Sequence, residues 1–224
     1  MIELHYYPST ASMAPHILLH ELGAPHRLVL VDRTQNAQKM TGYLKLNPNG
    51  LIPVLIDKRS DGNVVLYESA AICLHLCDTH LDAGLAPALG TPERAHFYKW
   101  LMWLTNTLQA TLITYFYPER WVNSGNVSGV SQVKAHSEVK VGLLLDQLDN
   151  EMAKHSKSHA APWLLGANYS AVDAYTLMLC RWTRNFDSQP ARARQHLGPY
   201  LQRMLARPAV MKAFAAEELE QPWV

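Results

Sequence analysis

Glu68 and Ser69 stand where the pattern of a strand gives way to that of a helix. A serine hydroxyl at a helix start, together with the free backbone N–H groups there, can hold a carboxylate. The neighbouring carboxylate of Glu68 can meet an ammonium group. Taken alone, the pair is more typical of a plain helix cap, so an ion-binding pair and a cap are both open.

Pro53 follows Ile52 in the segment GLIPVL, residues 50–55. A proline that opens an edge strand after an apolar residue is a candidate for a cis peptide bond, although most X–Pro bonds are trans. The segment alone favours a trans proline that starts a strand.

A third motif lies in YSAVDAY, residues 169–175. Ser170 followed three residues later by Asp173 matches an N-capping box, in which two side chains and two backbone groups bond reciprocally. We assign this motif to folding and give it no chemistry.

Two differently organised parts of the chain must position these residues. In the first part the pattern predicts the order β-α-β-(loop/α)-β-β-α. Its last two strands are predicted to form a hairpin, and a helix is predicted from about Ser69. The predicted strands are Ile2–Tyr7, Arg27–Val31, Val54–Ile56 and Val64–Leu66, with a turn at residues 61–63. The first helix is predicted to end just before Gly23.

The second part has no convincing strand. Residues 82–92 are rich in Gly, Pro and Ala and are interpreted as a linker, so we predict domains over residues 1–81 and 92–224. Beyond the linker apolar residues keep helical spacing, which predicts an all-α domain. The expected helices contain Leu101–Leu112, Val141–Met152, a start at Ser170, Pro199–Ala206 and, after a break at Pro208, Ala209–Glu218.

Composition restricts the function classes. Of 224 residues, 48% are hydrophobic and 17% are charged, which is typical of a globular protein. Twenty Lys and Arg against nineteen Asp and Glu give a net charge of +1, which argues against a nucleic-acid-binding protein. The sequence shows no membrane span, no signal peptide and no disulfide framework among its three cysteines, so we expect a cytoplasmic protein.

In their order along the chain, YYPSTASMAPH (6–16), LNPNGLIPVL (46–55), YESAAI (67–72) and the capping box resemble the cytosolic glutathione transferase family, and the opening segment is most similar to its bacterial branches. The resemblance covers nearly the whole chain. It implies an α/β thioredoxin-like N-terminal domain followed by an all-α helical domain, with glutathione as co-substrate. It also implies a homodimer and a role in detoxification.

The resemblance assigns the glutathione-binding residues. It implies that Pro53 is cis and that the backbone N–H and C=O of Ile52 pair with the cysteinyl part of glutathione. It places the γ-glutamyl end of glutathione at Glu68 and Ser69. A basic residue before LNPNG meets the glycine carboxylate in this family, for which Lys39 is our choice and Lys45 the competitor.

A free thiol has a pKa of about 8.5, so the enzyme must stabilise the thiolate with hydrogen bonds and a helix dipole. The first helix supplies the dipole, and a hydroxyl near the end of the first strand supplies the donor. The candidates, in our order of preference, are Ser9, Ser12, Tyr6 and Thr10. Each has an ordinary alternative, as a helix-cap residue or, for Tyr6, as part of the core.

Cysteine and metal chemistry are not expected. Bacterial relatives of the beta class carry a cysteine at the position of Ala11, so a mixed disulfide with glutathione is excluded there. The eleven histidines show no ligand spacing with cysteine, and His16 and His20, four residues apart, are interpreted as a surface pair. We therefore predict no metal site.

The acceptor substrate is expected between the domains. Trp103, Asn106 and Gln109 are spaced three residues apart and are predicted to share one stripe facing the sulfur, although aromatic residues at helical spacing often belong to the core. The predicted function is attack of the glutathione thiolate on a small, electrophilic, largely apolar substrate. The alternatives are a glutathione-dependent isomerase or dehalogenase, and a non-catalytic glutathione-binding or regulatory protein.

Overall fold

The computed structural model describes residues 1–224, which form two compact units. The first unit contains residues 1–86 and 204–221, and the second contains residues 87–203 and 222–224. The sequence-based division at residues 82–92 splits the chain into two continuous segments, whereas each unit of the structure combines two separate segments. Helix α9 (Pro208–Ala216) returns to the first unit because its buried residues pack against α1 (Met13–Glu21).

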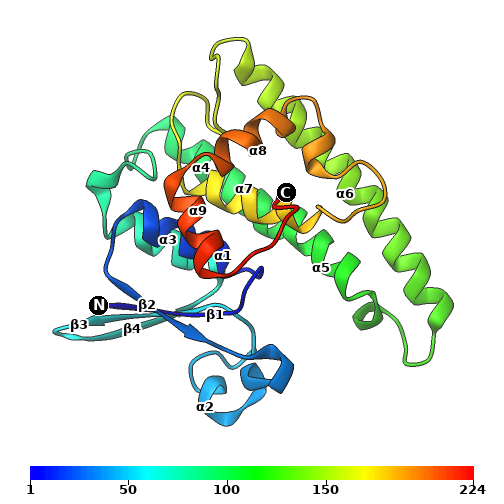
Figure 1. The fold of residues 1–224 in the computed structure, drawn as a ribbon, viewed down its shortest axis with the longest axis horizontal. Coiled ribbons are helices and arrows are strands. Elements are labelled where there is room, and N and C mark those ends of the chain that lie inside the picture. Colours follow the sequence, from blue (N-terminus) through cyan, green and yellow to red (C-terminus); the bar gives the residue numbers. More distant parts are fainter. The chain divides into compact units, whose positions relative to one another are not determined.

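A four-stranded sheet forms the centre of the first unit (Figure 1). The strands are β1 (Ile2–Tyr6), β2 (His26–Leu30), β3 (Val54–Arg59) and β4 (Gly62–Tyr67), in the order β2-β1-β3-β4. Strand β1 is parallel to β2 and antiparallel to β3. The predicted strands are confirmed, but the hairpin strands are longer than predicted because the turn contains only Ser60 and Asp61.

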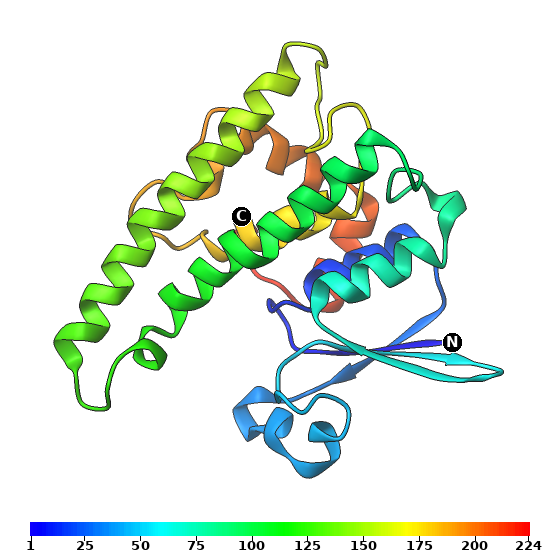
Figure 2. The same ribbon diagram turned by 180° about the vertical axis from the view of Figure 1, so that it is seen from behind.

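Helices cover the two faces of this sheet unequally (Figures 1 and 2). Helices α1, α3 (Ser69–Asp78) and α9 lie on one face, where Leu4 of β1 and Ile72 of α3 are fully buried. The short helix α2 (Thr41–Leu44) lies on the other, with a small core around Tyr43 and Val54. This is the thioredoxin-like arrangement that the resemblance implied, and it is confirmed.

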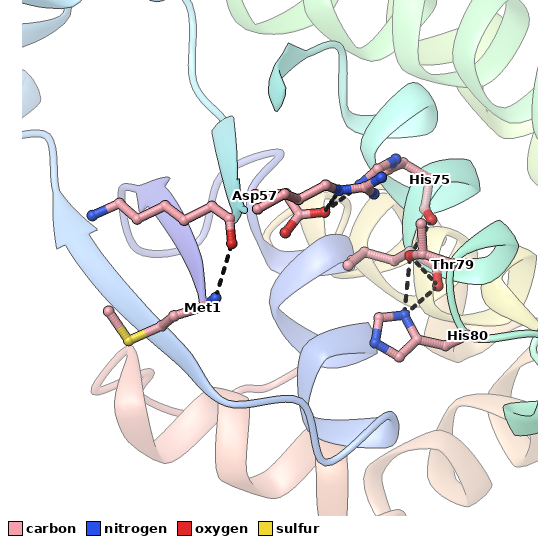
Figure 3. Close-up of polar contacts among 8 residues, drawn as sticks. Met1, Asp57, His75, Thr79 and His80 are labelled. Carbon is pink, nitrogen blue, oxygen red and sulfur yellow. Dashed lines mark hydrogen bonds and ion pairs between the residues drawn. The ribbon is translucent and has the colours of Figure 1, made fainter. Parts of the chain in front are cut away.

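One end of the sheet is closed by polar contacts between β3 and α3 (Figure 3). The carboxylate of Asp57 accepts a hydrogen bond from Arg59 Nε at 2.8 Å and lies 3.1 Å from His75 Nε2. The N-terminal amine of Met1 donates to the carbonyl of Lys58 at 3.3 Å (Figure 3). These contacts stabilise the end of the sheet that carries the chain's N-terminus. They do not involve the opposite end of the sheet.

The second unit is helical, as predicted, with no strand beyond an isolated bridge between Trp163 and Gly166. A π-helical segment, η4, interrupts its first long helix. The elements from residue 81 on are η3 (Leu81–Ala83), α4 (Pro92–Trp103), η4 (Leu104–Gln109), α5 (Ala110–Phe116), η5 (Pro118–Trp121), α6 (Val127–Ser156), α7 (Ala171–Trp182), η6 (Ala191–Ala193) and α8 (Leu197–Leu205), which runs to the boundary with the first unit. No helix combines the length and apolar character that crossing a bilayer requires.

The predicted capping box opens α7. Asp173 is fully buried, and its carboxylate accepts hydrogen bonds from the backbone N–H groups of Ser170 and Leu164, each at 2.8 Å. The hydroxyl of Tyr200 donates to the same carboxylate at 3.0 Å. Burial nevertheless raises the pKa of Asp173 to about 6, against the lowering effect of these hydrogen bonds.

Candidate functional site

The sheet register brings the three segments singled out in the first half of the sequence to one end of the sheet. His5 of β1 pairs with Val54 of β3, and Val54 pairs with Tyr67 of β4. Since β1 runs antiparallel to β3, the chain after β1, the chain before β3 and the chain after β4 all leave at this end. These are the hydroxyl-rich residues 6–12, Ile52-Pro53 and Glu68-Ser69.

Two of the four candidate hydroxyls are engaged within the chain. The hydroxyl of Thr10 donates to the carbonyl of Tyr7 at 2.7 Å, and that of Ser12 donates to the same carbonyl at 3.1 Å. Their oxygens lie 3.1 Å apart, and Ser12 is fully buried. Thr10 and Ser12 therefore shape the turn between β1 and α1.

The other two candidates, Ser9 and Tyr6, keep their hydroxyls free of partners within the chain, and both are half-buried. Ser9 has a φ of 60°, a left-handed conformation that is uncommon outside glycine and asparagine. Burial, with Glu217 and Glu218 as smaller causes, raises the pKa of Tyr6, so its hydroxyl stays protonated at neutral pH.

Glu217, which the sequence did not single out, fixes the turn from the far end of the chain. Its Oε2 accepts a hydrogen bond from the backbone N–H of Ser9 at 2.9 Å, and its Oε1 lies 2.8 Å from Nδ1 of His16. The side chains of His16 and Glu217 are fully buried. Arg207 adds two hydrogen bonds to Glu21, at 2.6 and 2.8 Å, which tie the start of α9 to α1.

Ile52 and Pro53 are joined by a cis peptide bond. The cis bond that the resemblance implied is confirmed, and the trans bond favoured by the segment alone was wrong. Tyr43 and Asn47 hold the preceding carbonyl of Leu51 with hydrogen bonds of 2.8 Å each. The backbone N–H and C=O of Ile52 make no hydrogen bond within the chain, so both are available to an extended ligand.

Glu68 and Ser69 begin helix α3, as predicted, and the hydroxyl of Ser69 has a partner within the chain. It donates to the carbonyl of Ala11 at 2.9 Å and thereby ties the start of α3 to the turn before α1. The first backbone hydrogen bond of α3 runs from Ile72 to Glu68, so the N–H groups of residues 69–71 are free. Glu68 is exposed and has a φ of 72°.

Of the two lysine candidates, Lys39 reaches the turn that precedes Ile52. Its ammonium group donates to the carbonyl of Asn49 at 3.2 Å. Gly50, with a φ of 59°, permits this approach, since a Cβ there would lie 2.8 Å from Lys39 Nζ. The side chain of Lys45 makes no hydrogen bond, which favours Lys39.

The predicted acceptor residues do not share one stripe. Trp103 lines a hollow of about 510 Å³ with residues of α6 such as Gln147, whereas Gln109 accepts a hydrogen bond from Tyr175 of α7 at 2.5 Å. Asn106 is exposed. The π-helical segment between Trp103 and Gln109 has more residues per turn than an α-helix, so a spacing of three no longer selects one face.

All three cysteines lie within helices. Cys73 and Cys77 are in α3, Cys180 is in α7, and all three are buried thiols outside any disulfide. Burial raises the pKa of Cys73 well above its ordinary value and that of Cys180 to about 12. None of them is placed or ionised for thiol exchange.

Comparison with known proteins identifies the family that this architecture represents. Residues 8–79 match the model of the glutathione S-transferase N-terminal domain, and residues 76–208 match that of the C-terminal domain. The chain belongs to the glutathione S-transferase family, a family of enzymes that use glutathione as co-substrate.

Relatives cover nearly the full chain. Glutathione S-transferase GstA of Escherichia coli O157:H7 is 27% identical over 98% of this chain and 100% of its own. The disulfide-bond oxidoreductase YfcG of Escherichia coli K12 is also 27% identical, over 98% of this chain and 97% of its own. A sphingomonad glutathione S-transferase, solved with glutathione, has a TM-score of 0.79 at 28% identity and covers 97% of this chain and 100% of its own.

Proposed function

We propose that this protein binds glutathione at the end of the sheet marked by Ile52-Pro53, activates its thiol as thiolate, and directs the sulfur at a small, electrophilic, largely apolar substrate. One observation carries the proposal. The sheet register gathers at one end an unpaired backbone amide and carbonyl at Ile52, the free N–H groups of α3 and a hydroxyl without a partner at Ser9.

The chemistry of these groups matches the three parts of glutathione. The free N–H groups at the start of α3 suit the γ-glutamyl carboxylate, and the exposed carboxylate of Glu68 suits its ammonium group. The backbone of Ile52 suits an antiparallel pair with the cysteinyl residue. Lys39, whose ammonium group already reaches the turn at Asn49, suits the glycine carboxylate.

In this proposal Ser9 donates the hydrogen bond that stabilises the thiolate. Thr10 and Ser12 are engaged by the carbonyl of Tyr7, whereas the hydroxyl of Ser9 is free. A hydrogen bond to a charged group contributes about 1.5–3 kcal/mol, which corresponds to a pKa shift of roughly one to two units. The N-terminus of α1 adds a favourable dipole.

The finer parts of the function rest on the sequence. The roles of Trp103, Asn106 and Gln109 at the acceptor, the homodimer, the cytoplasmic location and the role in detoxification stay predictions. An isomerase or dehalogenase would use the same thiolate, and a binding protein would hold glutathione without lowering its pKa. The pKa of the bound thiol therefore separates a binding protein from the three kinds of enzyme.

The test is an absorbance titration of the glutathione thiolate bound to the wild type, to Ser9→Ala and to the matched control Ser12→Ala. The wild type should lower the thiol pKa of bound glutathione by at least one unit. Ser9→Ala should abolish most of that lowering, whereas folded Ser12→Ala should retain it. A shift that survives Ser9→Ala assigns the donor to Tyr6 and is checked with Tyr6→Phe. Glutathione bound with an unshifted thiol would contradict the catalytic proposal.

A further inference from the structure

Three histidines gather on the face of the sheet covered by α1. His16 and His20 are one turn apart on α1, and His26 opens β2. One ring nitrogen from each lies within 4.8 Å of the other two. The ring centroid of His20 lies 5.0 Å from those of both His16 and His26. The sequence prediction treated the first two as a surface pair, which was wrong because His16 is fully buried.

Two of the three histidines are held through Nδ1. Nδ1 of His16 lies 2.8 Å from the Glu217 carboxylate, and Nδ1 of His26 lies 2.8 Å from the carbonyl of Ala24. Both partners accept hydrogen bonds, so each Nδ1 carries the proton, and in the neutral ring Nε2 carries a lone pair. A carboxylate or carbonyl behind the imidazole is the usual support of a metal-ligating histidine.

Two Nε2 atoms of the cluster have no protein partner. Nε2 of His16 and Nε2 of His20 are buried and make no hydrogen bond. Leaving a buried polar atom unsatisfied costs about 1–3 kcal/mol, so two such atoms side by side require a reason. A bound cation that accepts both lone pairs supplies one.

We propose that His16, His20 and His26 form a three-histidine site for a divalent transition-metal ion of the Zn²⁺ type. Three neutral imidazoles suit zinc, nickel and copper ions better than the oxygen-preferring magnesium and calcium. His20 and His26 are half-buried, so the cluster lies near the surface, and a tetrahedral ion there would take its fourth ligand from water. Tetrahedral zinc with Zn–N distances of about 2.0–2.1 Å needs nitrogens ~3.4 Å apart, so binding draws the rings together.

Two charged groups act on this site. Lys212 is the cation that opposes metal binding, and Glu217 is the carboxylate that faces the cluster through His16.

The sequence could not show this site because its third member comes from another element. A pair of histidines at i and i+4 is a frequent half of a zinc site, but it needs a third ligand. The parallel register places Ile2 opposite His26 and thereby sets the start of β2 beside the sheet face that α1 covers. His26 lies ten positions after His16, which is outside the ligand spacings of the common zinc motifs.

The test is equilibrium dialysis of the full chain, freed of metal with a chelator, against Zn²⁺ without glutathione. One ion should bind per chain, and His20→Asn and His26→Asn should each weaken binding at least tenfold. His96→Asn, at an exposed position on α4, is the matched control and should bind as the wild type does. Zinc binding absent from the wild type, or unchanged in both cluster variants, would overturn the proposal.

Two further measurements keep the test independent of how the variants fold. In the wild type, Zn²⁺ should perturb the ¹⁵N resonances of three imidazoles. Two of these, His16 and His26, should carry their proton on Nδ1. Lys212→Met, which removes the opposing cation, should tighten zinc binding several-fold. Perturbation of only exposed histidines, with no effect of Lys212→Met, would assign the binding to the surface and refute the site.

Discussion

The carboxylate of Glu217 accepts a hydrogen bond from the backbone N–H of Ser9 at 2.9 Å, across 208 residues of chain. The same carboxylate holds His16 with its other oxygen. The conformation of Ser9, with its φ of 60°, therefore depends on a residue at the end of α9. One buried carboxylate thus connects the turn that presents the free hydroxyl with the histidine cluster.

Glu217→Gln should destabilise the fold and disturb Ser9 together. An amide keeps one oxygen acceptor, so it cannot accept from both Ser9 and His16. We expect a loss of about 2 kcal/mol in the free energy of unfolding, since hydrogen bonds to a charged group are lost from a buried site. Urea unfolding measures that loss, and the thiolate titration should show a smaller pKa shift of bound glutathione.

Glu218→Gln is the matched control because Glu218 is the exposed neighbour of Glu217. It changes the net charge by the same amount and should leave both measurements near the wild-type values. If Glu217→Gln and Glu218→Gln behaved alike, the hydrogen bond to Ser9 would have no role in positioning the hydroxyl.

Gly50→Ala should weaken the turn that carries Lys39. A Cβ at residue 50 would lie 2.9 Å from the carbonyl oxygen of Gln38, which is backbone and cannot easily move, and the φ of 59° is itself costly for alanine. We expect a loss of about 1–2 kcal/mol of stability. Because Lys39 Nζ would be displaced as well, the KM for glutathione should rise several-fold.

Gly42→Ala provides the comparison. Gly42 lies in α2, where an added methyl group would meet no atom within 4 Å and the φ is negative, so alanine should be neutral or slightly stabilising. An unchanged KM for glutathione in folded Gly50→Ala would remove Lys39 from the binding site. If Gly50→Ala and Gly42→Ala changed the free energy of unfolding equally, the short contacts and the positive φ at residue 50 would not destabilise the alanine variant.

The sequence predicted the elements well because their signals are local. The alternation of apolar and polar residues predicted β1, and Gly23 predicted the end of α1. The spacing of Ser170 and Asp173 predicted the start of α7. The candidate site was predicted less completely, since its missing members depend on tertiary contacts. Nothing near Glu217 in the sequence indicates that α9 returns to α1, and nothing near Trp103 indicates a π-helical segment.

The cysteines give a prediction about disulfide chemistry. Thiol exchange requires an accessible thiolate, and the three thiols are buried, with the pKa of Cys73 raised well above its ordinary value. Incubation of the native protein with oxidised glutathione should therefore leave its mass unchanged. The same incubation in concentrated urea should modify all three cysteines, which controls for reactivity. One glutathionyl group on the native protein would place this chain closer to disulfide oxidoreductases.

The buried carboxyl of Asp173 should make stability fall as pH rises. Its pKa of about 6 in the folded protein lies above the value of about 3.9 in an unfolded chain, so the native state binds more protons between these values. The free energy of unfolding should therefore decrease from about pH 4 to pH 6 and this contribution should then stay constant. A difference of two pKa units corresponds to roughly 3 kcal/mol.

Asp173→Asn removes that proton equilibrium and keeps an oxygen that can accept from Leu164 or Tyr200. The free energy of unfolding of both proteins is measured by urea unfolding at several pH values. As the pH rises from 4 to 6, the wild type should lose stability relative to Asp173→Asn. Asp61→Asn, in the exposed turn between β3 and β4, should give a difference that does not change over this interval. A flat difference for Asp173→Asn would mean that its hydrogen bonds outweigh burial and hold the carboxylate ionised.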